Sequence, residues 1–267
     1  MSMESMIVTV SPDRLRELQD LPVTPAHMAY RMGKGPHLFR ITGSTAPRGG
    51  LMFLDCRSFD GFGATAPFCQ EVLRECMARG FTGVVCDFEG GCLPPLEQVV
   101  QELGSQCFRR SWTLLVPEQY GHCSPHAQVC ISSALSGGTL VQRLQEAQER
   151  FGRDRVVLAL QRVAEDFFLP SPTGSGTPLT QEELQERIRQ RQPSIFFSHE
   201  LCARYFTYMS RESGAHFVLF DDGATLAQKL QVARSLDIRT VLAAWPEIAG
   251  AAEELGLRRA APGRVLR

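Results

Sequence analysis

An α/β fold, a (β/α)8 barrel of the TIM type, is predicted by three features of the sequence. Strand-like and helix-like segments alternate from residue 50 onward, a pattern typical of right-handed β–α–β units. Eight strands can be counted when the N-terminal part contributes one, and eight strands close this barrel. The length of 267 residues matches its usual size. Because no repeat interrupts the pattern, we expect one barrel domain over residues 1–267. Residues 1–49 are weakly assigned to it, and their strands can be shortened or irregular.

The expected strands are short apolar runs, as the buried strands of a parallel sheet are. Seven of them follow residue 50, at 51–55, 81–89, 112–116, 128–132, 156–160, 216–220 and 240–244. The eighth belongs to the N-terminal part, at 7–10 or at 38–41.

Helices between these strands are predicted by apolar residues at helical spacing. Such stripes lie at residues 68, 72 and 76, at 96, 99, 100 and 103, and at 140, 144 and 147. Pro94 and Pro95 suit a helix start. Thr180 and Glu183 have the spacing of a capping box. A further helix is expected near 224–236.

Composition narrows the classes of partner and cofactor. The net charge is −1, so no basic field favours nucleic acid or an anionic membrane as a partner. Nine cysteines form no C-x-x-C motif and no Cys/His group with zinc spacing, which favours reduced, buried thiols and predicts no metal. The N-terminus has no basic and apolar leader pattern, so we expect cytoplasmic synthesis without a signal peptide. The sequence does not predict an oligomeric state.

Two carboxylates stand at the end of the run over residues 80–90. Asp87 and Glu89 are two positions apart on a strand, so their side chains are expected on the same side. The carboxyl ends of barrel strands are where such enzymes place their chemistry. Two close carboxylates repel, so at least one holds its proton more tightly, as a general acid must.

Acids and aromatic residues also follow the other predicted strands. The full set is Asp55, Asp87, Glu89, Glu118, Tyr120, Glu165, Asp166, Asp221, Asp222 and Trp245. Carboxylates beside aromatic rings suit sugar recognition and glycosidic cleavage. Simpler roles stay open, because Trp245 can be ordinary core and the two aspartates at 221 and 222 can cap the helix that follows. No nucleophile elbow or phosphate-binding glycine motif is present.

These residues resemble glycoside hydrolase family 18. Residues 80–89 resemble its fourth-strand signature, D-G-x-D-x-D-x-E, and the bacterial spore-peptidoglycan (cortex-lytic) N-acetylglucosaminidase branch is the nearer form. The second half is similar to further motifs of that branch. These are residues 156–170, which resemble a strand followed by Y-D-W-x-x-P, residues 204–208, residues 216–222 with Lys229, and residues 240–245.

The resemblance implies hydrolysis of N-acetylglucosamine-containing glycans, in spore cortex peptidoglycan or chitin-like oligomers, by substrate-assisted retention. Glu89 matches the general acid, and Asp87 matches the residue that orients the attacking acetamide. Trp245 matches the floor of the sugar subsite, and no cofactor or metal is required. Further sugar contacts are expected from Asp55, Glu118, Tyr120, Asp166 and Asp222.

Three departures from the family pattern leave other functions open. Thr82 and Val85 stand where the motif has its first and second Asp, and residues 131–134 replace the segment whose Tyr supports the acetamide. A missing hydrogen bond of that kind costs about 10² or more in rate. One alternative is therefore an inactive barrel that binds glycans or has a structural role on a spore. Another is an unrelated small-molecule barrel enzyme that uses Asp87 and Glu89 as acid and base.

Overall fold

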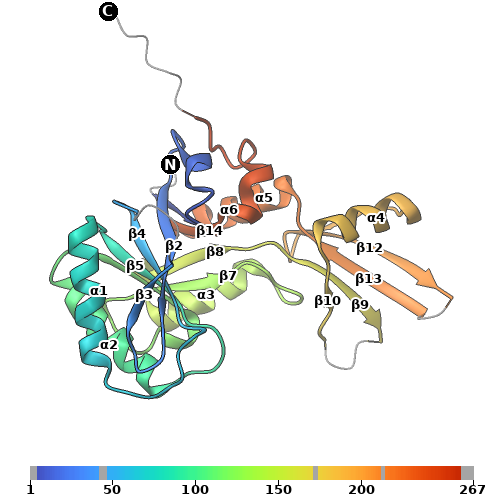
Figure 1. The fold of residues 1–267 in the computed structure, drawn as a ribbon. Coiled ribbons are helices and arrows are strands. Elements are labelled where there is room, and N and C mark those ends of the chain that lie inside the picture. Colours follow the sequence, from blue (N-terminus) through green and yellow to red (C-terminus); the bar gives the residue numbers. More distant parts are fainter. Residues whose placement is uncertain (1–4, 42–46, 171–173, 212–213, 260–267) are drawn as a thin grey trace, which may run out of the picture.

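Eight parallel strands close a barrel in the part of the chain that the structure describes. The structure is a computed structural model that describes residues 5–41, 47–170, 174–211 and 214–259 (Figure 1). In barrel order the strands are β1 (Ser5–Val10), β2 (Thr24–Met32), β4 (Leu51–Asp55), β5 (Gly83–Asp87), β6 (Thr113–Pro117), β7 (Gln128–Ser132), β8 (Val156–Leu160) and β14 (Thr240–Ala244). Strand β1 pairs in parallel with both β14 and β2, which closes the ring. The predicted barrel is confirmed.

The membership of the barrel differs from the prediction at two strands. Residues 216–220 were expected in the barrel but belong to β13 (Gly214–Phe220), a strand of a second, antiparallel sheet. Residues 7–10 lie in β1 and are in the barrel, whereas β3 (Leu38–Arg40) pairs antiparallel with β2 outside it. Strand β2 takes the remaining place. It contains Pro25, His27 and Arg31, so it lacks the apolar run by which buried parallel strands are found.

The helices cover the outside of the barrel. They are α1 (Thr65–Arg79), α2 (Pro94–Phe108), α3 (Leu140–Phe151), α5 (Gly223–Ser235) and the short α6 (Trp245–Ile248), with 3-10 turns η1 (Leu15–Leu18), η2 (Glu118–Tyr120), η3 (Arg153–Arg155) and η4 (Ala249–Ala251). The predicted stripe of Phe68, Val72 and Cys76 is fully buried. Gly80 ends α1 at φ 67°, a left-handed conformation that glycine adopts at low cost.

The barrel interior is apolar up to its carboxyl end. One cluster fills it with seven residues from six of the strands: Ile7, Ala26, Leu51, Phe53, Val85, Leu115 and Val157. Asp55 and Asp87 follow Phe53 and Val85 by two positions, so they share their inward face and lie at the mouth of the barrel. Val85 therefore places an isopropyl group directly below Asp87, where the family pattern has an acid.

A five-stranded antiparallel sheet is inserted between β8 and α5. Its order is β10 (Thr177–Pro178), β9 (Ala164–Leu169), β13, β12 (Ala203–Ser210) and β11 (Phe196–Ser198). Helix α4 (Gln181–Arg191) packs on one face, where Leu184, Phe206 and Val218 are buried together. Figure 1 shows this sheet and α4 standing to one side of the barrel. The insertion was not predicted, although the capping box of Thr180 and Glu183 at the start of α4 was, and it is present.

Within the described ranges, no helix is both long enough and apolar enough to cross a membrane.

Candidate functional site

Asp87 and Glu89 line one cavity at the carboxyl end of the barrel. The cavity has a volume of about 260 Å³. Its polar lining residues are Thr9, Arg57, Asp87, Glu89, Gln161 and Glu247. Asp87 is the last residue of β5 and is half-buried, whereas Glu89 is exposed on the loop that follows. The structure thus brings together the two carboxylates that were predicted as the catalytic pair.

The environment of Asp87 disfavours its charged form. Burial and the nearby charge of Glu89 raise the pKa of Asp87 to about 6, with a smaller contribution from Asp55. The guanidinium of Arg57 acts in the opposite direction and lowers this pKa. Asp87 therefore changes its charge close to neutral pH, in the range where general acids and bases work.

Arg57 is held beside the carboxylate pair by Asp55. Its Nε donates to Asp55 Oδ2 at 3.0 Å, and its backbone N–H donates to Oδ1 at 2.6 Å. The bond with Asp55 raises the pKa of Arg57. Asp55 lies opposite Asp87 in the register of β4 and β5, but it is not among the residues that line the cavity. It orients a cation toward the site.

Gln161 presents an amide to the cavity from the end of β8. Ser132 Oγ, at the end of β7, donates to Gln161 Oε1 at 2.6 Å and accepts from the backbone N–H of Ala134 at 3.1 Å. The backbone of Gln161 is fixed as well, because its N–H donates to Ser133 Oγ at 3.0 Å. In the described part of the chain Gln161 Nε2 has no hydrogen-bond partner, so its two N–H donors are available to a ligand.

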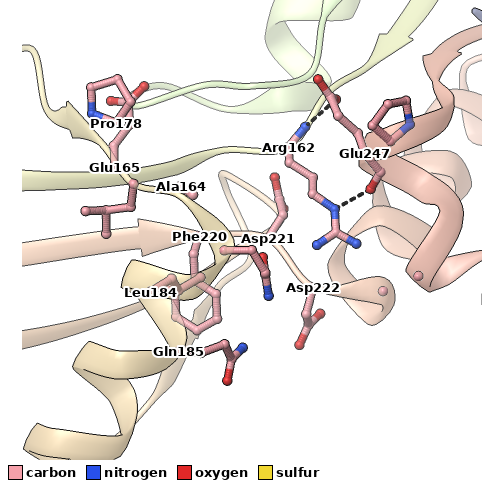
Figure 2. Close-up of a pocket in the computed structure, with 15 residues that line it drawn as sticks. Arg162, Ala164, Glu165, Pro178, Leu184, Gln185, Phe220, Asp221, Asp222 and Glu247 are labelled. Atoms are coloured by element: carbon pink, nitrogen blue, oxygen red, sulfur yellow. Dashed lines mark hydrogen bonds between the residues drawn. The ribbon is translucent and has the colours of Figure 1, made fainter. Parts of the chain in front are cut away.

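A second, larger cavity lies between the barrel and the inserted sheet. Its volume is about 700 Å³, and Figure 2 shows its walls. Arg162 and Glu247 stand on the barrel side, where the backbone N–H of Arg162 donates to Glu247 Oε2 at 3.2 Å and Arg162 Nε donates to the carbonyl oxygen of Glu247 at 2.5 Å. Gln185 of α4 stands on the opposite side. Glu247 lines both cavities, and burial raises its pKa.

Asp221 and Asp222 line the larger cavity. Asp222 caps α5, as predicted, by accepting from the backbone N–H of Thr225 at 2.9 Å, and it pairs with Arg204. Asp221 accepts from Lys229 Nζ at 2.5 Å, and both side chains are fully buried. Both aspartates line the cavity, but Asp221 is held in its buried ion pair, whereas Asp222 is half-buried.

Four other predicted binding residues do not line either cavity. Glu118 pairs with Arg143 and Arg150, and Tyr120 is fully buried against Phe88. Asp166 lies in the inserted sheet, where Arg187, Tyr208 and His216 surround it. Trp245 is 6% exposed, and its Nε1 donates to Glu17 Oε2 at 2.6 Å. The structure gives each of them a structural partner, and their contacts with a sugar stay predictions.

Four polar lining residues were not predicted from the sequence: Thr9, which lies within β1, and Arg57, Gln161 and Glu247. Arg57, Gln161 and Glu247 each lie within three positions after a barrel strand, at the ends of β4, β8 and β14. The same rule that selected Asp87 therefore contains the signal for them. Only acids and aromatic rings were considered at these positions, whereas Arg57 carries a guanidinium and Gln161 an amide. Glu247 was not considered because Trp245 had already been assigned to the end of its strand.

Comparison with known proteins bears on the fold. No family model matches the sequence, and no curated protein matches it. A chitinase from Chromobacterium violaceum superposes with a TM-score of 0.67 at 14% identity, covering 96% of this chain and 100% of that one. The Bacillus megaterium spore cortex-lytic enzyme gives 0.61 at 12% identity, covering 91% and 70%.

A third similar solved structure is described as a member of glycoside hydrolase family 18. It is a glycoside hydrolase family 18 N-acetylglucosaminidase from Paenibacillus barengoltzii, with a TM-score of 0.58 at 13% identity over 90% of this chain and 94% of that one. Identities this low establish likeness of fold. The chain therefore has the (β/α)8-barrel fold that is seen in solved structures of family 18 glycoside hydrolases, spore cortex-lytic enzymes and chitinases.

Proposed function

We propose that this protein is a glycoside hydrolase that acts on N-acetylglucosamine-containing glycans by substrate-assisted retention. The observation that carries the proposal is the placement of Asp87 and Glu89 at the end of one barrel strand, in the wall of one cavity. The fold shared with chitinases and a spore cortex-lytic enzyme supports the choice of glycan class. Chitin-like oligomers and spore cortex peptidoglycan are the two substrates to test, and a spore-associated location is part of the same proposal.

In the first step the substrate's own acetamide is the nucleophile. Its carbonyl oxygen attacks the anomeric carbon while the bond from that carbon to the leaving oxygen breaks. The carboxyl group of Glu89 gives its proton to the leaving oxygen. The carboxylate of Asp87 accepts a hydrogen bond from the acetamide N–H and stabilises the positive charge that the ring intermediate acquires.

In the second step water opens the cyclic intermediate. The carboxylate of Glu89 takes a proton from the water as its oxygen attacks the anomeric carbon, and the acetamide is restored. Attack occurs from the face that the leaving group left, so the configuration is retained. Glu89 regains its proton and the cycle closes.

Gln161 is the residue we place at the acetamide's other end. The Tyr that supports the acetamide in the family pattern is absent from residues 131–134. Gln161 Nε2 can donate to the acetamide oxygen from the neighbouring strand, because Ser132 fixes the amide through Oε1. A hydrogen bond to this oxygen would hold the nucleophile beside the anomeric carbon, in the geometry that its attack requires.

The larger cavity extends the site for sugars on one side of the cleaved bond. Glu247 lines both cavities, so a glycan bound at Asp87 and Glu89 can continue past it. The carboxylates of Asp222 and Glu247 and the amide of Gln185 offer partners to sugar hydroxyl groups. The inserted sheet thus supplies one wall of a binding groove.

The test is the activity and binding of Glu89→Gln. The rate at which reducing ends are released from chitin oligomers and from spore cortex fragments should fall at least about 10²-fold. This is the lower end of the rate contribution expected of a general acid. Oligosaccharide affinity, measured by calorimetry, should change little because glutamine keeps the shape of the side chain. Glu102→Gln, on the exposed face of α2, is the matched control and should retain full activity. Equal turnover by the wild type and Glu89→Gln would contradict the assignment.

A non-catalytic glycan-binding barrel is the second candidate. Val85 favours it, because its side chain is buried in the barrel interior below Asp87 and offers no group to share the proton of that carboxyl. Oligosaccharide binding by the wild type without any release of reducing ends would favour this candidate over the first.

A further inference from the structure

Three potential metal ligands meet on the surface beside the loop that carries Glu89. Glu97 lies in the first turn of α2, and His122 and Cys123 follow η2. One ligand atom from each lies within 4.8 Å of the other two. This cluster shares no residue with either cavity, and the mechanism does not use it.

Two of the three separations between ligand atoms fit a single tetrahedral ion. His122 Nε2 lies 3.6 Å from Glu97 Oε1 and 3.6 Å from Cys123 Sγ. Bonds of about 2.0–2.3 Å to zinc that meet at a tetrahedral angle place their ligand atoms about 3.3–3.6 Å apart. A separation of 3.6 Å between an imidazole nitrogen and a carboxylate oxygen is too long for a hydrogen bond. Glu97 and His122 are thus spaced as co-ligands of an ion.

We propose that Glu97, His122 and Cys123 bind a zinc ion. Thiolate, imidazole and carboxylate are all ligands that this borderline-soft ion accepts. His122 is exposed, so a water molecule can occupy the fourth position. Binding replaces the proton of the Cys123 thiol by the metal, so one S–H bond breaks, one S–Zn bond forms and the proton goes to solvent.

The ion would stabilise the loop that carries Glu89. The side chains of residues 119 and 120, directly before the cluster, hold that loop by donating to its backbone carbonyl oxygens. Gln119 Nε2 donates to the carbonyl oxygens of Phe88 at 2.9 Å and Gly90 at 3.3 Å. Tyr120 Oη donates to the carbonyl oxygen of Gly91 at 3.3 Å. Zinc would link the segment that makes these bonds to α2, and so it would hold the loop in position.

Binding of Co²⁺, a spectroscopic stand-in for zinc, tests the site without reference to activity. The full chain is stripped with a chelator and titrated in a Cys92→Ser background, which removes the one exposed thiol among the described cysteines. We expect the intense visible bands of tetrahedral cobalt, a thiolate-to-metal band in the near ultraviolet, and loss of both when Zn²⁺ displaces the cobalt.

Variants of the ligands identify the site. His122→Ala, Cys123→Ser and Glu97→Gln should each weaken Zn²⁺ binding by at least about tenfold, the lower end of the loss expected even for a group outside the coordination shell. His126→Ala is the matched control, because His126 lies on the same loop but stacks on Phe108. It should bind as tightly as the parent chain.

Two results would overturn the proposal. One is a parent spectrum that lacks the thiolate band, and the other is a spectrum unchanged in His122→Ala or Cys123→Ser. Circular dichroism checks that each variant is folded. A thermal scan adds a second readout, since Zn²⁺ should raise the Tm of the parent and of His126→Ala but not that of His122→Ala.

Discussion

Ser132 Oγ donates a 2.6 Å hydrogen bond to Gln161 Oε1 across the ends of two neighbouring barrel strands. This bond fixes which end of the Gln161 amide faces the ligand. It leaves the two N–H groups of Nε2 for the cavity that Asp87 and Glu89 line. A serine and a glutamine together thus offer the hydrogen-bond donor that the sequence lacks at the expected tyrosine.

Gln161→Ala should therefore lower kcat by about 10², the loss expected when a reacting group is no longer held in position. Ser132→Ala should lower kcat less, because it releases the amide without removing it. Steady-state kinetics on a chitin oligomer measure both values. If Gln161→Ala has the same kcat as the wild type, Gln161 does not contact the substrate as proposed.

The plot of kcat/KM against pH should have an acidic limb that reports the ionisation of Asp87. The proposed mechanism requires the carboxylate of Asp87, whose pKa is raised to about 6, so kcat/KM should rise as pH increases through that value. Arg57 lowers this pKa, so Arg57→Gln should move the limb to higher pH. Asp87→Asn should remove the limb together with most of the activity. A limb that does not move in Arg57→Gln would contradict this assignment.

The same group makes a contribution to stability that depends on pH. The pKa of Asp87 is higher in the folded state than in the unfolded state, so the folded state binds more protons between about 4 and 6. The contribution is therefore fully present below that window and is lost as pH rises through it. Urea unfolding of the wild type and Asp87→Asn at pH 4 and pH 7 should show a larger loss of stability with rising pH in the wild type.

Lys229 should be essential to the fold. It forms a fully buried ion pair with Asp221, which also accepts from the backbone N–H of Val163 at 2.8 Å. Lys229→Ala leaves a buried carboxylate without its cation and should lower the free energy of unfolding by about 3–5 kcal/mol. Lys34, the other lysine of the sequence, is exposed, and Lys34→Ala should change that free energy by less than about 0.5 kcal/mol. Chemical denaturation compares them.

The inserted sheet should affect long substrates more than short ones. Gln185 lines the larger cavity from α4, away from Asp87 and Glu89. Gln185→Ala should raise KM for oligomers long enough to reach α4 and leave KM for the shortest substrates unchanged. Gln190→Ala, on the same helix but outside the cavity, is the control. An equal effect on KM for short and long oligomers would show that the larger cavity does not bind the glycan.

Strands that are apolar runs were predictable, and those that are not were missed. Strand β5 was located from its sequence because Phe81, Val84 and Val85 are buried between glycines. Strand β2 was missed because Pro25, His27 and Arg31 interrupt its apolar character. Residues 216–220 formed a strand as expected, yet a short apolar run does not say whether its partners run parallel or antiparallel, so the inserted sheet was not foreseen.

The candidate site follows the same division. Asp87 and Glu89 were found because carboxylates two positions apart at a strand end form a local pattern. Gln161 and Ser132 were not found, because a bond between residues 29 positions apart depends on two strands meeting in the fold. Glu97 reaches His122 for the same reason, and no spacing in the sequence marks their approach.

Proton NMR of the first sugar released by the wild type tests the central claim most directly. A β-linked N-acetylglucosamine oligomer should yield the β-anomer first, before mutarotation, because the acetamide attacks and water then returns to the same face. The deacetylated oligomer, which lacks the nucleophile, should not be cleaved. Release of the α-anomer first, or cleavage of both oligomers at equal rates, would contradict substrate-assisted catalysis by Asp87 and Glu89.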